Sequence, residues 1–195
     1  VADFNVLDLS DGGLAARRAF APGEARASYA RQLGNLRAAL AREGVRIVSA
    51  PEDFAAAKAQ SALAGFITVE GGDFLDGDLS RVGAAFADGV RSITLMHYRP
   101  NEIGDIQTAP AVNDGLTPFG ADVIREMEAL GMLVDLAHAA EPAARQALEV
   151  CTKPVMCSHT HLESAALSHP RFISLELARE IAARGGVIGA WPVGI

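Results

Sequence analysis

From residue 65 onward, the sequence repeats one pattern: a short apolar segment, then a polar or glycine-rich turn, then the hydrophobic spacing of an amphipathic helix. The apolar segments cover residues 65–70, 92–97, 132–138, 155–159 and 186–190. The helix-like stretches between them cover about residues 79–88, 118–130, 141–149 and 175–183. Strands that alternate with helices of this length form right-handed βαβ units, so the pattern predicts an α/β fold with a parallel sheet.

Local signals mark the ends of the predicted helices. Thr117 is a suitable N-cap with proline at the next position, and Gly131 follows the last residue of its helix. Ser174 stands in the same place before the helix predicted at 175–183. The N-terminal third is less regular, and it predicts a helix over 25–43, a strand over 45–49 and, after a capping sequence, a helix over 54–61.

The length of the chain limits how these units can be arranged. The chain has 195 residues, 50% of them hydrophobic, which is enough for a domain with a substantial core. No linker or low-complexity run divides it, so we expect a single domain over residues 1–195. The units are too few to close an eight-stranded barrel, which takes about 250 residues. The sequence therefore predicts either an open doubly wound sheet or an incomplete barrel whose first and last strands are absent from this chain.

Composition excludes two classes of partner. The formal net charge is −7 and no lysine or arginine cluster occurs, so we expect no nucleic acid partner. No run of about 18 apolar residues occurs, so no segment is expected to span a membrane. Cys151 and Cys157 form neither a disulfide framework nor a C-x-x-C motif, so we interpret them as ordinary thiols. Two cysteines without a disulfide pattern favour a reducing, cytoplasmic compartment, while a periplasmic location stays open.

Four of the predicted strands end in a side chain that can bind a metal or transfer a proton: Glu70, His97, His138 and His159. The carboxyl ends of parallel strands open on one side of a sheet, where ligands and catalytic groups collect. Each residue alone has a simpler interpretation, because a glutamate before two glycines is often a solvated turn residue and a single histidine is often structural. However, three of only five histidines occupy the same place in successive units, which favours a shared site.

The residue types in this set suit zinc. Two neutral imidazoles and one carboxylate make a common zinc shell, and a carboxylate can also bridge two metal ions. Two further residues leave alternatives open. His161 forms an H-x-H pair with His159, so it either joins the metal ligands or lies in the loop beyond the strand. Arg171 either binds a carboxylate through its guanidinium fork or lies at the surface.

Longer stretches of the sequence resemble the renal (membrane) dipeptidase family of zinc peptidases. The similarity runs in order from about residue 66 to residue 173, through the stretches ITVEGGDFL, VRSITLMHYRPNEIGD, GLTPFGADVIREMEALGMLVDLAHAAEPAARQALEV and KPVMCSHTHLESAALSHPRFIS. The EGG block alone is weak evidence, whereas the LTPFG…GMLVDLAH and P-V-M-x-S-H blocks are specific. The resemblance implies a (β/α)₈ TIM-type barrel with two zinc ions at the carboxyl ends of its strands.

The resemblance also implies a role for each candidate residue. Glu70 corresponds to the carboxylate that bridges the two zinc ions, and His138 and His159 correspond to the histidines on the second ion. His97 corresponds to a catalytic histidine that contacts the substrate near the reacting carbonyl. Arg171 corresponds to the arginine that binds the terminal carboxylate of the substrate. The implied activity is hydrolysis of dipeptides, including those with a D-residue at the second position, by a metal-bound hydroxide, and the family often forms homodimers.

The sequence departs from the family pattern at three points. The H-x-D pair that ligates the first zinc is absent, and so is the aspartate of the last strand. Both absences predict that these 195 residues are an incomplete view of a longer protein. The third departure is Asp73, which stands where relatives often have a histidine, and which we expect in a solvated loop with Asp76 and Asp78.

Two other functions therefore stay open. The first is that of an amidohydrolase-type metal hydrolase, built on the same barrel and acting on a non-peptide amide. The second is that of a degenerate, non-catalytic family member, because a chain without the H-x-D pair could hold only one zinc ion.

Overall fold

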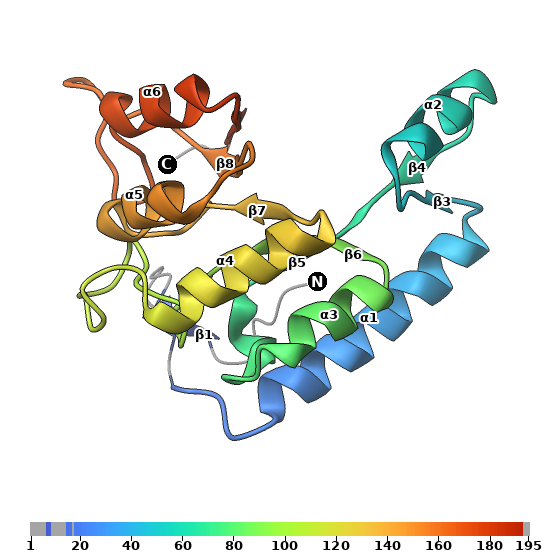
Figure 1. The fold of residues 1–195 in the computed structure, drawn as a ribbon, viewed down its shortest axis with the longest axis horizontal. Helices are drawn as coiled ribbons and strands as arrows, with labels where there is room; N and C mark the ends of the chain where they lie inside the picture. Colours follow the sequence, from blue (N-terminus) through green and yellow to red (C-terminus); the bar gives the residue numbers. More distant parts are fainter. Residues whose placement is uncertain (1–6, 9–14, 17, 193–195) are drawn as a thin grey trace.

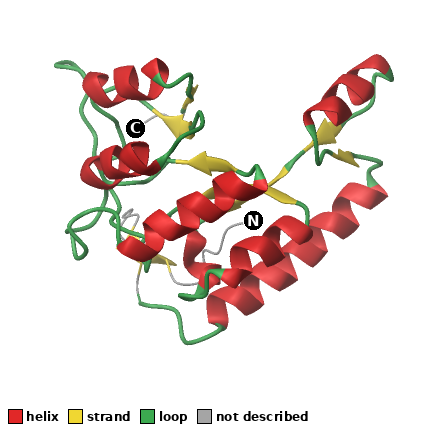
Figure 2. Ribbon diagram, viewed as in Figure 1, coloured by secondary structure: helices red, strands yellow, loops and turns green. Residues whose placement is uncertain are grey.

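The computed structural model describes residues 7–8, 15–16 and 18–192. Its centre is a parallel sheet of five strands (Figures 1 and 2). These strands are β5 (Ile67–Glu70), β6 (Val90–Thr94), β7 (Leu133–Asp135), β8 (Met156–Thr160) and β9 (Val187–Ala190). Each strand pairs with the next one along the chain, so the order in the sheet is the order in the sequence.

A helix precedes each of the last four strands of the sheet. These helices are α3 (Ser80–Ala87), α4 (Pro118–Leu130), α5 (Glu141–Val150) and α6 (Leu175–Ala183). The predicted α/β fold with a parallel sheet is confirmed. A doubly wound sheet reverses its strand order at a switch point, and this sheet does not, so that alternative is wrong. The strands of the described residues form an open sheet and do not close into a barrel.

The N-terminal part adds a smaller parallel pairing at the edge of this sheet. It contains α1 (Glu24–Arg42), β3 (Arg46–Ile47), α2 (Pro51–Ala59), β4 (Ala64–Gly65) and the 3₁₀ helix η1 (Gly72–Leu75). β3 pairs with β4, and only Phe66 separates β4 from β5. The chain therefore runs directly from this pair into the main sheet, and the β3–α2–β4 unit projects from the rest of the molecule in Figure 1. A short antiparallel pair, β1 (Leu7–Asp8) with β2 (Ala15–Ala16), precedes α1.

Capping groups confirm the predicted ends of two helices. The side chain of Thr117 accepts a hydrogen bond from the backbone N–H of Gly120 at 3.0 Å, and Gly131 ends α4 in the left-handed conformation with φ 76°. The side chain of Ser174 accepts a hydrogen bond from the backbone N–H of Leu177 at 3.1 Å and opens α6. None of the described helices is long and apolar enough to cross a membrane.

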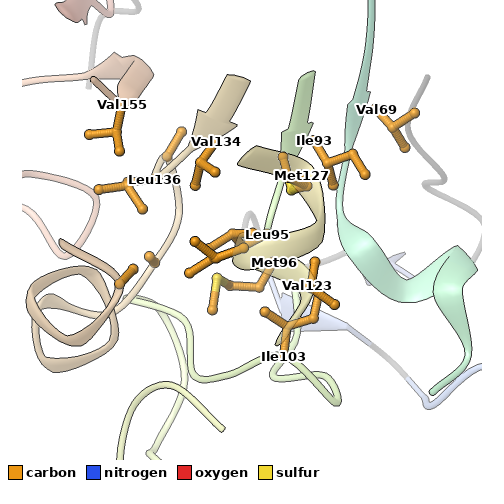
Figure 3. Close-up of a cluster of buried hydrophobic side chains, with 14 of the residues drawn as sticks. Val69, Ile93, Leu95, Met96, Ile103, Val123, Met127, Val134, Leu136 and Val155 are labelled. Carbon is orange, nitrogen blue, oxygen red and sulfur yellow. The ribbon is translucent and has the colours of Figure 1, made fainter. Parts of the chain in front are cut away.

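Apolar side chains between the sheet and its helices form one core (Figure 3). Its fully buried members include Ile93 from β6, Met127 from α4, and Leu95 and Met96 from the segment that follows β6. Burying a side chain of this size contributes about 1.5–3 kcal/mol. Since Leu95 and Met96 directly precede His97, the core itself fixes the position of that histidine.

Candidate metal centre

Three histidine side chains surround one carboxylate oxygen. The Nε2 atoms of His97, His138 and His159 each lie 3.2 Å from Oε1 of Glu70. The Nε2 atoms of His138 and His159 are 3.0 Å apart. Donor atoms of Glu70, His97 and His138 all lie within 4.8 Å of one another, which is close enough to share a metal ion. The structure thus brings together all four residues that the sequence placed at strand ends.

The parallel strands deliver these side chains to one edge of the sheet. Glu70 is the last residue of β5, and His159 lies within β8. His97 and His138 lie beyond the last residues of β6 and β7, so these strands end earlier than predicted. His138 has φ 68°, a left-handed conformation that is uncommon for a residue with a side chain. The backbone turns there, and this turn carries the buried imidazole into the cluster.

The two glycines after Glu70 let the end of β5 pack against the segment that carries His97. Gly71 has φ 101°, and a Cβ added there would lie 3.1 Å from the Cβ of His97. A Cβ added at Gly72 would lie 2.8 Å from the backbone oxygen of Leu95, which is too close for a side chain. Glycine is therefore needed at both positions for β5 to approach the neighbouring segment this closely.

The cluster shifts the pKa values of its members. Burial raises the pKa of Glu70, but hydrogen bonds from His138, His159 and His97 outweigh burial and hold that pKa well below its usual range. Burial lowers the pKa of His138 to about 3, which keeps its imidazole neutral near pH 7. An ionised carboxylate beside a neutral imidazole is the protonation state that metal binding requires.

Asp135 ties the strand ends of the site together. It is buried at the end of β7, where its carboxylate accepts a hydrogen bond from Oγ1 of Thr94 at 2.8 Å. It also accepts hydrogen bonds from the backbone N–H groups of Ala137 at 3.0 Å and Ser158 at 2.9 Å. The three donors come from β6, from the segment after β7 and from β8, which are the segments that lead to the three histidines.

The outward-facing nitrogens of the histidines differ in their surroundings. Oγ of Ser158 lies 2.8 Å from Nδ1 of His159, a contact that orients the ring with its Nε2 toward Glu70. Nδ1 of His138 is buried and makes no hydrogen bond within the described part of the chain. His97 packs against the ring of Tyr98, with ring centroids 3.8 Å apart.

Arg171 is not a surface residue, because only 1% of it is exposed. Its guanidinium donates to the side-chain carbonyl of Gln107 and, at 3.4 Å, to the backbone carbonyl of His159. The guanidinium carbon lies 5.4 Å from the centre of the Trp191 ring. Burial lowers the pKa of Arg171. Among the described residues, no carboxylate lies within 4.0 Å of this guanidinium.

Asp73 is not the solvated loop residue that the sequence suggested. Its carboxylate lies 3.0 Å from a guanidinium nitrogen of Arg99 and 3.3 Å from the side-chain nitrogen of Asn101, and burial raises its pKa. The contact joins η1 to the segment after β6. No local pattern marks such a contact, because its residues are far apart in the sequence.

His161 lies beyond β8 with its ring centroid 4.9 Å from that of Phe172, so its loop interpretation is confirmed.

A family model described as membrane dipeptidase (peptidase family M19) matches residues 24–191. The chain belongs to the membrane dipeptidase family. The resemblance recognised in the sequence is thereby confirmed. This membrane dipeptidase family member is 45% identical over 73 residues to the dipeptidase tcpJ of Claviceps purpurea, a match that covers 37% of the chain and 17% of that relative.

Solved structures share the fold of this membrane dipeptidase family member. The probable dipeptidase PvdM from Pseudomonas aeruginosa has a TM-score of 0.80 at 22% identity, over 89% of this chain and 48% of that one. A metallopeptidase from Rhodobacter sphaeroides, bound to a phosphinate mimic of the dipeptide L-Ala-D-Ala, has a TM-score of 0.72 at 22% identity, over 83% of this chain and 47% of that one. The match thus spans about half the length of these structures.

Proposed function

We propose that this chain is part of a zinc-dependent dipeptidase that hydrolyses the peptide bond of dipeptides. The convergence of Glu70, His97, His138 and His159 beside the buried Arg171 carries the proposal. Membership of the membrane dipeptidase family supports metal-dependent hydrolysis. The related structure with a bound dipeptide mimic supports a dipeptide as the substrate.

The donor set fits zinc. Glu70 offers a carboxylate, and His138 and His159 offer imidazole nitrogens that are 3.0 Å apart, a combination of ligand types that zinc prefers. Zinc bound there would supply a water of lowered pKa and would polarise the substrate carbonyl. We extend the proposal to two zinc ions, for both of which the Glu70 carboxylate would be available as a ligand. The second ion then needs donors besides these three, and the 195 residues contain no H-x-D pair.

We assign His97 to the substrate rather than to the metal. The Nε2 atoms of His97, His138 and His159 lie equally close to Glu70, at 3.2 Å, so the family resemblance supports this assignment and the distances do not. His97 is itself buried and directly follows the buried Leu95 and Met96, which restricts where its ring can lie. A fixed donor at this point stabilises the negative charge that develops on the carbonyl oxygen during attack.

Arg171 is the proposed anchor for the C-terminal carboxylate of the substrate. A buried guanidinium with no carboxylate partner among the described residues supports this role, because an anionic ligand would supply the missing charge. An anchor so close to the metal centre selects a free C-terminus near the scissile bond. This makes the enzyme a dipeptidase rather than an endopeptidase.

We also propose that the sheet is an arc of a (β/α)₈ barrel. Parallel strands that pair in sequence order, each preceded by a helix, are the arrangement of such a barrel. The pairing of β3 with β4, which continues into β5, adds one more parallel strand to this arc. Because these 195 residues alone are too few to close a barrel, the test is a crystal structure of a longer chain that spans the full length of the relatives, and an open sheet in that structure would contradict the proposal.

Zinc content and hydrolysis of a simple dipeptide, measured on one preparation, test the function. About two zinc ions per chain with turnover support the dipeptidase. One ion or none, without turnover, favours the non-catalytic alternative.

Arg171→Ala is expected to lower kcat/KM for the dipeptide by about tenfold or more and to leave hydrolysis of the C-terminally amidated dipeptide unchanged. If Arg171→Ala hydrolysed the dipeptide at an unchanged rate, Arg171 would not bind the substrate carboxylate. That result would favour the alternative enzyme, which hydrolyses a non-peptide amide.

A further inference from the structure

The side chain of Gln107 accepts a hydrogen bond from the guanidinium of Arg171. The guanidinium is buried, yet the side chain that accepts from it is a neutral amide. A carboxylate would be a better partner, because it carries the opposite charge and can accept two parallel hydrogen bonds from the guanidinium. Gln107 therefore occupies the place on the guanidinium where a ligand carboxylate would bind more strongly.

The main chain of Gln107 is fixed, whereas its side chain has only one hydrogen-bond partner besides Arg171 among the described residues. The backbone N–H donates to the carbonyl of His138 at 2.9 Å, which ties the residue to the metal centre. The side-chain amide group donates only a long hydrogen bond of 3.4 Å, to the carbonyl of Phe172. A ligand that took over the guanidinium would have little else to break in order to move this side chain.

A cavity of about 490 Å³ borders Gln107. Gln107 and Phe172 line it, together with small and apolar residues that include Ile106, Ala109 and Pro170. Asp105 and Asp114 also border it, so an amide that turned into the cavity would meet polar groups. The cavity offers space beside Gln107 into which its side chain could turn.

We propose that Gln107 is a gate on the anion site of Arg171. Its carbonyl oxygen satisfies the guanidinium when no ligand is bound, and a ligand carboxylate displaces it toward the cavity. The inference rests on the proposed role of Arg171 and adds a specificity-determining residue to it. A ligand that carries an amide in place of the carboxylate exchanges one neutral acceptor for another, so it gains too little to displace Gln107.

Binding of two small ligands tests the gate: N-acetylalanine and N-acetylalaninamide, each titrated into the zinc-loaded protein. Calorimetry gives the affinities. Trp191 fluorescence gives a second signal, because this is the only tryptophan in the sequence and its ring lies 5.4 Å from the Arg171 guanidinium. The unchanged protein is expected to bind the acid at least about tenfold more tightly than the amide.

Two substitutions move the expected affinities in opposite directions. Gln107→Glu places a permanent carboxylate on Arg171, so the affinity for the acid should fall by about tenfold or more. Gln107→Ala removes the competing acceptor, so the affinity for the acid should rise about fivefold. Gln60→Glu is the matched control, because Gln60 accepts a hydrogen bond from Arg46 at 2.8 Å at the exposed surface, and its ligand affinities should not change.

The gate is overturned if Gln107→Glu and Gln107→Ala, both shown by thermal unfolding to be folded, bind the acid as the unchanged protein does. Arg171→Ala separates this failure from failure of the proposed function. If Arg171→Ala lowers the affinity for the acid while the Gln107 variants have no effect, only the gate is wrong. If Arg171→Ala leaves that affinity unchanged, the anchor role of Arg171 is wrong as well.

Discussion

At the scale of single residues, His138 combines burial with a left-handed backbone. This conformation costs a residue with a Cβ about 1–2 kcal/mol, and glycine avoids the cost. The surrounding packing must therefore hold the residue in place, as is common at functional sites. The backbone conformation of His138 therefore places the imidazole in the cluster at a cost to the stability of the chain.

A pair of substitutions isolates this backbone cost. His138→Gly is expected to be about 1 kcal/mol more stable than His138→Ala in zinc-free protein, because both remove the imidazole and only glycine relaxes the conformation. Urea unfolding measures the difference. His161 does not have a positive φ, so His161→Gly should be less stable than His161→Ala, and this opposite sign is the control. Equal stabilities for the two His138 variants would argue against the backbone cost.

Zinc affinity and turnover separate the roles of the histidines. His97→Ala is expected to keep zinc and to lose about 100-fold in turnover, because it removes the proposed donor to the developing oxyanion. His138→Ala is expected to lose both, because it removes a proposed zinc ligand. Competition with a chelator measures the zinc affinity. A large loss of zinc affinity in His97→Ala would place His97 among the ligands instead.

The four clustered residues could be predicted from the sequence because parallel strands bring their ends together. The partners of Arg171 and Asp73 could not, since Gln107 and Arg99 belong to loops that carry no periodic pattern. The left-handed turn at His138 could not be predicted either, because most histidines have a negative φ and nothing in the local sequence distinguishes this one.

At the scale of elements, Asp135 acts as a shared acceptor for three segments. Asp135→Ala is expected to lower the free energy of unfolding by about 3 kcal/mol and to weaken zinc binding, because it leaves buried donors unsatisfied. Asp135→Asn keeps one oxygen for the backbone donors, and the Thr94 hydroxyl can turn to donate elsewhere, so it should cost about half as much. Denaturant unfolding and zinc titration check both effects.

Asp122→Ala is a control for these variants, because Asp122 pairs with Arg125 on the exposed face of α4 and should change stability by less than about 0.5 kcal/mol. If Asp135→Ala left zinc affinity unchanged while it destabilised the fold, Asp135 would have no positioning role at the metal centre.

The loop between β6 and α4 folds around another carboxylate, that of Asp105. It accepts backbone hydrogen bonds from Val112 at 3.0 Å, Asn113 at 3.1 Å and Gly115 at 2.8 Å. Burial raises the pKa of Asp105, but these hydrogen bonds outweigh burial and lower it overall. A lowered pKa in the folded state gives stability that is fully present above the unfolded value, about 3.9, and is lost as the pH falls through the folded value.

Asp105→Asn should therefore destabilise the protein more at pH 7 than at pH 3, because the wild-type contribution disappears on acidification and the asparagine does not titrate. Unfolding at both pH values measures the two differences. A difference that stays constant with pH would mean that the charge of Asp105 does not contribute.

Helices were more predictable than strands. The bounds expected for 118–130 and 175–183 match α4 and α6, since caps and hydrophobic spacing are local. α2 begins at Pro51, earlier than expected, because Asp53 accepts backbone hydrogen bonds from Ser49 and Ala50 and caps the helix there. A strand ends where its hydrogen bonds to the neighbouring strand end. The sequence of one apolar segment does not show how far the neighbouring strand extends, so it does not predict that end.

At the scale of the whole molecule, zinc should stabilise the fold, because the donor set comes from several strands of one sheet. Zinc at 100 times its dissociation constant adds about 2.7 kcal/mol to the free energy of unfolding, which raises Tm by roughly 5–10 °C for a chain of this size. Thermal unfolding with zinc and with a chelator measures the shift. His138→Ala should show no such shift, and an equal shift in that variant would mean that zinc binds elsewhere.

The order of the strands has a consequence for synthesis. Because each strand of the sheet pairs with its neighbour in the sequence, every pairing becomes available as soon as the next strand leaves the ribosome. Glu70 enters the sheet with β5, whereas His159 arrives only with β8. A nascent chain that stops before β8 already carries three strands of the sheet but lacks His159, so the proposed zinc ligand set is complete only after most of the sheet has been translated.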